Sequence, residues 1–87
     1  MWKAKYAVKT YEYTIQLDSF DLGQLIDGLE ARAEAWRLTA VYLETGEAPD
    51  GFVIEECSDA EEARRIAEHY QRILANIIQQ QTEQRAR

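Results

Sequence analysis

The residues of this chain that could do chemistry gather in the passage from Glu44 to Glu62. The passage holds half of the chain's 16 acidic residues, no lysine and no arginine. The only cysteine, Cys57, lies inside it, and the only histidine, His69, follows shortly after its end. Such groups bind metal ions, attack as thiolates and transfer protons, so each of these three chemistries has to be considered.

None of the three has the residues that it needs. A zinc site takes three or four converging nitrogen or sulfur ligands, and calcium loops and zinc-protease helices have spacings that do not occur here. A thiolate at Cys57 would face five carboxylates within five positions, with His69 as the only base. The carboxylates lack a cleft that would separate their pKa values. We interpret Cys57 as a small packed residue and expect no enzyme, no metal and no cofactor.

The acidic passage itself is only partly explained by local structure. Glu47, Asp50 and Asp59 suit turns and caps, and Glu62 suits a helix N-terminus. Glu55 and Glu56 differ, because adjacent residues of a strand face opposite ways and both are charged. Two interpretations stay open: charges that protect a strand edge, or carboxylates that meet a basic partner. The favoured prediction is a partner-binding acidic surface made of Glu47, Asp50, Glu55, Glu56, Asp59 and Glu62.

Size and charge narrow the class of protein. The 87 residues make one domain with a net charge of −6, which disfavours direct nucleic-acid or anionic membrane binding. A single cysteine forms no internal disulfide, no apolar run approaches the roughly 20 residues that span a bilayer, and the first residues lack a signal sequence. We expect a cytoplasmic protein, with one domain over residues 1–80 and a frayed polar tail over 81–87.

The elements that must carry these residues begin with a strand. Tyr11, Tyr13, Ile15 and Leu17 alternate with polar residues, the period of a half-buried strand. Upstream, Tyr6 and Val8 have the opposite parity, so a bulge near residues 9–10 is expected. After a turn at residues 49–51, "FVIEEC" at residues 52–57 predicts a second short strand.

Two helices are expected to accompany the strands. The first follows an N-cap at Ser19 or Asp21 and ends at Gly46. Its apolar residues recur at spacings of four and three, a heptad pattern. This core or dimer stripe consists of Leu22, Ile26, Leu29, Ala33, Trp36, Ala40 and Leu43. A second set lies on the opposite side of the helix and comprises Gly28, Ala31, Ala35, Leu38 and Tyr42. The second helix follows a capping box from Ser58 to Glu61.

Together the elements predict a small two-layer α+β domain, strand–helix–strand–helix, with two long amphipathic helices. The first helix would be about 36 Å long, whereas a compact 87-residue body is about 31 Å across. A helix that is apolar on two opposite sides is covered on both. A homodimer would cover the first helix along its full length and on both apolar sides. A monomer with the sheet on one side of the first helix and the second helix on the other is the alternative.

Residues 25–77, above all the run from Trp36 to Gly46 and the segment "IEECSDAEEA", resemble small reading frames of bacterial phages and other mobile elements. The resemblance implies a binder directed at a host protein and supplies no catalytic residues. The favoured function is therefore a non-enzymatic acidic protein that docks on a basic protein surface, such as an anti-CRISPR-like inhibitor. The alternative is a structural or regulatory homodimer whose acids only keep an edge strand soluble.

Overall fold

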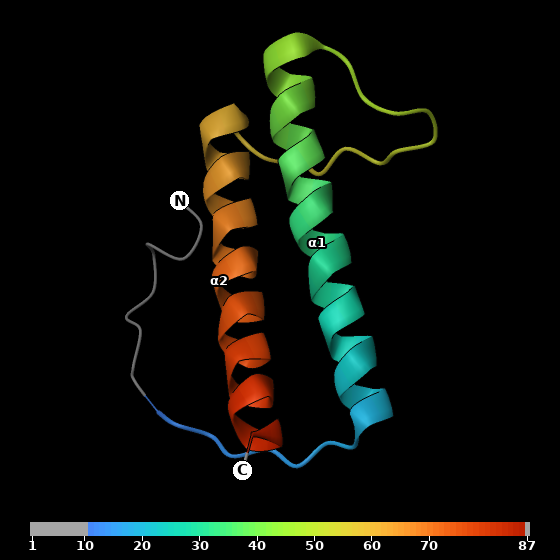
Figure 1. Ribbon diagram of the computed structural model, residues 1–87. Helices are drawn as coiled ribbons and strands as arrows, with labels where there is room; N and C mark the ends of the chain where they lie inside the picture. Colours follow the sequence, from blue (N-terminus) through green and yellow to red (C-terminus); the bar gives the residue numbers. More distant parts are fainter. Residues whose placement is uncertain (1–10, 87) are drawn as a thin grey trace.

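The computed structural model describes residues 11–86, which form an antiparallel hairpin of two long helices. Helix α1 spans Ser19–Thr45 and helix α2 spans Ala60–Arg85. An extended segment, residues 11–18, precedes α1, and the loop 46–59 joins the two helices at the far end (Figure 1). The molecule measures 47 × 34 × 17 Å, so it is a slab in which the two helices lie side by side in one layer (Figure 1).

The predicted α+β fold is wrong, because residues 11–86 contain two helices and no strand. A strand is held by hydrogen bonds to a neighbouring strand. The first expected strand precedes α1, and the second lies in the loop, where the N–H of Glu55 bonds to the Thr39 side chain instead. Ile15 is 74% exposed, so its place in the alternating pattern gives it no buried face. The earlier part of the expected first strand, with Tyr6, Val8 and the bulge near residues 9–10, lies outside the described residues.

The N-cap of helix α1 lies one residue before Ser19, the nearer of the two expected caps. Asp18 is the N-cap, and its carboxylate accepts a hydrogen bond of 2.8 Å from the backbone N–H of Asp21. The prediction of Ser19 or Asp21 as the cap is therefore wrong. The prediction of Gly46 at the other end is confirmed: its φ of 79° is left-handed, and its N–H bonds to the carbonyl of Tyr42.

Helix α2 is capped by the same chemistry, again displaced by one residue from the prediction. Asp59, not Ser58, is the N-cap and accepts from the N–H of Glu62 at 2.8 Å. The Glu62 carboxylate in turn accepts from the N–H of Ser58 at 3.1 Å. At the other end α2 runs to Arg85, so residues 81–85 of the expected tail are helical, and Arg87 lies outside the described residues.

The core is the seam between the helices, and it is concentrated in the half of the hairpin near the loop. From α1 it takes Ala33, Trp36, Thr39 and Ala40, and from α2 it takes Ala63, Ile66 and Ala67. The alanines let the helices approach closely, and the Trp36 ring fills the space that they leave. The heptad stripe of α1 follows this seam: its first three residues are half-buried, the next three are buried, and Leu43 is 43% exposed.

Candidate functional site

The acidic loop is attached to α1 through the side chain of Thr39. This hydroxyl is completely buried; it donates to the carbonyl of Ala35 at 2.8 Å and accepts from the backbone N–H of Glu55 at 3.0 Å. A buried hydroxyl that uses both its donor and an acceptor site holds its surroundings in one arrangement. The loop therefore has a fixed point in its second half.

A second attachment lies at the side chain of the same loop residue. An Arg32 guanidinium nitrogen lies 3.2 Å from a carboxylate oxygen of Glu55. The guanidinium carbon is also 5.9 Å from the ring centroid of Trp36 and 5.6 Å from that of Tyr70, within the range of cation–π contacts. Arg32 thus connects α1, α2 and the loop, with a side chain that is 48% exposed.

The six acids of the expected docking surface fall into two groups. Glu55 pairs with Arg32, while Asp59 and Glu62 accept backbone N–H groups at the start of α2. The other three have exposed side chains with no ion pair or hydrogen bond to another residue between positions 11 and 86. We call these three residues the loop acids: Glu47, Asp50 and Glu56.

Two further acids near the loop are neutralised within the chain. Glu44 at the end of α1 pairs with Arg64 at the start of α2, and Glu61 pairs with Arg65 one turn later at 3.0 Å. Between residues 11 and 86, Asp59 and Glu62 accept from backbone N–H groups and form no ion pair, so no side-chain cation in that range neutralises them. The loop end of the hairpin keeps the charges of these two residues together with those of the loop acids.

Sequence reasoning missed Arg32 and Thr39, the two residues that position the loop. Arg32 could have been noticed, because it precedes Trp36 by four positions and side chains at that spacing meet on a helix. Thr39 gave no signal, since its role depends on a backbone N–H from a residue 16 positions later. The expected surface was centred on Glu55 and Glu56. Glu55 forms an ion pair with Arg32, so of these two residues only Glu56 has a carboxylate without an ion pair in the described residues.

The cysteine and the histidine do not form a catalytic pair in the described structure. Cys57 is half-buried against the core, and its thiol donates to the carbonyl of Asp59 at 3.6 Å. Burial raises the pKa of this thiol, and the negative charge of Glu62 raises it further, which is the opposite of activation. His69 makes an edge contact with the ring of Tyr70 and lies 3.4 Å from Arg72. No cluster of three potential metal ligands occurs within residues 11–86.

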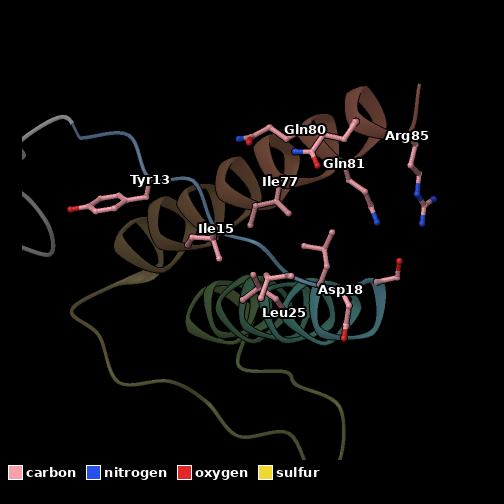
Figure 2. Close-up of a pocket in the computed structure, with 12 residues that line it drawn as sticks. Tyr13, Ile15, Asp18, Leu25, Ile77, Gln80, Gln81 and Arg85 are labelled. Atoms are coloured by element: carbon pink, nitrogen blue, oxygen red, sulfur yellow. The ribbon is translucent and has the colours of Figure 1, made fainter. Parts of the chain in front are cut away.

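A groove of about 430 Å³ lies at the opposite end of the hairpin. Its walls are the extended segment before α1, the first turns of α1 and the last turns of α2. Figure 2 shows Ile15, Leu25 and Ile77 lining it with apolar groups, and Gln80 and Arg85 extending beside it from α2. The wall formed by the segment is exposed, with Tyr13 at 80%, so the groove is open to solvent.

Comparisons with protein-family models, with curated proteins and with solved structures found no match to this chain. Neither helix of the described part of the chain is both long enough and apolar enough to cross a membrane.

Proposed function

We propose that this protein is a non-enzymatic binding module that docks on a basic surface of another protein through its loop acids. The observation that supports this proposal is the contrast within the loop. Thr39 and Arg32 attach the backbone and side chain of Glu55 to the hairpin, while Glu47, Asp50 and Glu56 remain exposed. Charges held in place on a firm support lose less entropy on binding than charges on a free chain.

The electrostatics of this end favour a cationic partner. The loop acids lie within ten positions of one another, and Asp59 and Glu62 add negative charge at the start of α2. Exposed like charges that are close together raise the local potential and speed the encounter with an opposite charge. Such binding weakens as salt rises, because the Debye length shrinks from about 10 Å at 0.1 M to about 3 Å at 1 M.

The test reverses two loop acids and compares them with two acids elsewhere. The Asp50→Lys/Glu56→Lys variant should lose the partners captured by the wild-type chain from a bacterial lysate at low salt. The matched control, Glu30→Lys/Glu68→Lys, changes the net charge equally at exposed helix positions and should keep those partners. Both variants should melt within a few degrees of wild type, because surface substitutions usually change stability by less than about 0.5 kcal/mol. Equal capture by all three proteins contradicts the docking proposal.

A second candidate is a structural or regulatory homodimer in which the acids only keep the loop end soluble. Its support is that Glu44 and Glu55 are paired with the chain's own arginines. The two candidates differ in their response to salt: partner capture through the loop acids should fall steeply, whereas a homodimer held by apolar contacts should not. The narrower anti-CRISPR-like role stays a prediction, because the comparisons found no relative that bears on it.

A further inference from the structure

The side of α1 that faces away from α2 carries an apolar stripe, in which Ala35 and Leu38 are half-buried and the other members are exposed. At 100° per residue this outer stripe lies opposite the buried seam and is interrupted by one polar residue, Gln24. The outer stripe comprises Phe20, Gly28, Ala31, Ala35, Leu38 and Tyr42. Phe20 is 73% exposed and Tyr42 is 40% exposed. A Cβ placed on Gly28 would meet no atom within 4 Å, so the middle of the stripe is open.

The outer side of α2 is charged, whereas the outer side of α1 is apolar. Of the two helices, α1 is therefore the one whose outer side lacks a packing partner. Glu61, Arg65, Glu68 and Arg72 give α2 a charged outer side, as expected for a helix that faces water. No helix in the described part of the chain covers the corresponding side of α1. A helix with apolar groups on two opposite sides belongs between two partners, and α2 supplies only one of them.

The exposed area is large enough for a second partner. The chain exposes 7069 Å², whereas a compact monomer of 10.1 kDa exposes about 5,300 Å². Exposed apolar residues of the extended segment and the loop contribute to this excess, and so do Phe20 and Tyr42 of the outer stripe. The difference exceeds the roughly 800 Å² that each partner buries in a standard interface. A thickness of 17 Å also leaves the hairpin without a second layer.

The order of residues in the stripe indicates which partner fits. Phe20 and Tyr42 each lie 11 positions from Ala31, about 16 Å along the helix. The small residues Gly28, Ala31 and Ala35 lie between these two aromatic residues. Turned end for end about Ala31, the stripe therefore sets Phe20 against Tyr42 and brings Gly28 and Ala35 within one position of each other, while Gln24 meets Leu38. A two-fold interface requires this self-complementarity, in which residue i meets residue j and j meets i.

We propose that a second copy of this chain packs on the outer stripe, with its α1 antiparallel and Ala31 on the two-fold axis. The two α1 helices then lie at the centre and each α2 lies outside. Phe20 of each copy packs beside Tyr42 of the other copy. The loop projects from α1 on the side away from α2 (Figures 1 and 2), so it flanks the same contact. The loop acids are not part of the stripe, and the dimer does not depend on the docking proposal.

The first experiment measures mass by sedimentation equilibrium for the full chain and two variants. Wild type should have about twice the mass of the 10.1 kDa chain. Ala31→Glu places two carboxylates against each other on the axis and should give a monomer that keeps its helical circular dichroism. Ala75→Glu makes the same change at an exposed position of α2 and should stay dimeric. Wild type that is monomeric at every concentration overturns the proposal, and so does Ala31→Glu that remains dimeric.

A second experiment tests the axis directly. In a Cys57→Ala background, Ala31→Cys should form a disulfide between copies under mild oxidation, because a residue on the axis meets itself within the 4.4–6.8 Å Cα separation typical of disulfides. Ala75→Cys in the same background should remain a monomer on a non-reducing gel. Cross-linking only through position 75, or equally through both positions, overturns the arrangement. The Asp50→Lys/Glu56→Lys variant should still dimerise, so failure of the docking proposal and failure of this one are distinguishable.

Discussion

The single side chain that does most to place the loop is Thr39. The side chain is fully buried, and its hydroxyl makes one hydrogen bond back along α1 and another to the loop backbone. Hydroxyls in helices often bond the carbonyl four residues earlier, and that bond alone contributes little. The bond from the N–H of Glu55 is the one with a structural effect, because it connects elements that are distant in the sequence.

Thr39→Val should destabilise the protein by about 1–2 kcal/mol. Valine keeps the shape of threonine but removes the acceptor, which leaves the N–H of Glu55 without its partner in a part-buried position. The free energy of unfolding, measured by urea titration, gives the result. The loop should also become easier to cleave with a protease after residue 47, since one of its attachments to α1 is lost.

Thr45→Val is the matched control for this change. Thr45 also donates to the carbonyl four residues earlier, at 2.8 Å, and also accepts a loop N–H, that of Glu47 at 3.2 Å. Thr45 is exposed, so water replaces the lost acceptor and the change should be within about 0.5 kcal/mol. Equal losses in the two variants would show that burial of Thr39 is not the cause.

At the scale of elements, the sequence predicted the helices well and the strands badly. The heptad spacing from Leu22 to Leu43 and the apolar run of α2 identify long helices, because a stripe of that length has no other explanation. The predicted N-caps were wrong by one residue or more. Asp18, Ser19 and Asp21 all have side-chain oxygens that could cap α1, and the local sequence does not decide among them. Gly46 was found because a left-handed residue at a helix end is almost always glycine.

The two strand predictions were wrong because strand formation depends on a pairing partner as well as on the residues of the segment itself. Alternation of apolar and polar residues shows that a segment could pair, but pairing needs a second strand within reach. Residues 11–17 precede α1 and residues 52–57 lie in the loop after it, and neither segment pairs as a strand. In the same way, the pairing of Glu55 with Arg32 could not be predicted from the acidic passage alone, since it depends on how the loop folds back.

Two glycines of the α1 region should respond to alanine in opposite directions. Gly46→Ala puts a Cβ on a residue with φ of 79° and should cost about 1–2 kcal/mol. Gly23→Ala lies within α1, where a Cβ meets no atom within 4 Å, and should stabilise by about 0.5–1 kcal/mol. Thermal unfolding of the two variants in one buffer provides the comparison. Two shifts of the same sign would mean that α1 does not end at Gly46.

At the scale of the whole molecule, the hairpin is too extended for its length. Its radius of gyration is 15.5 Å, whereas a compact chain of 87 residues has about 12 Å. The buried residues of the two helices are few, and five of the seven are alanine or threonine. A core of this size gives a small stability margin to one chain alone. Much of the stability should therefore come from association of two chains.

Association makes the melting temperature depend on protein concentration. Unfolding that separates two chains becomes harder by about 1.4 kcal/mol for each tenfold rise in concentration, which corresponds to about 3–6 °C for an assembly of this size. Scanning calorimetry of wild type over two decades of concentration should show that rise. Ala31→Glu should melt lower and at one temperature throughout, because each chain then unfolds alone. A melting temperature of wild type that does not change with concentration would mean that the thin hairpin is stable without a second copy, and that α1 carries its exposed aromatic residues for another reason.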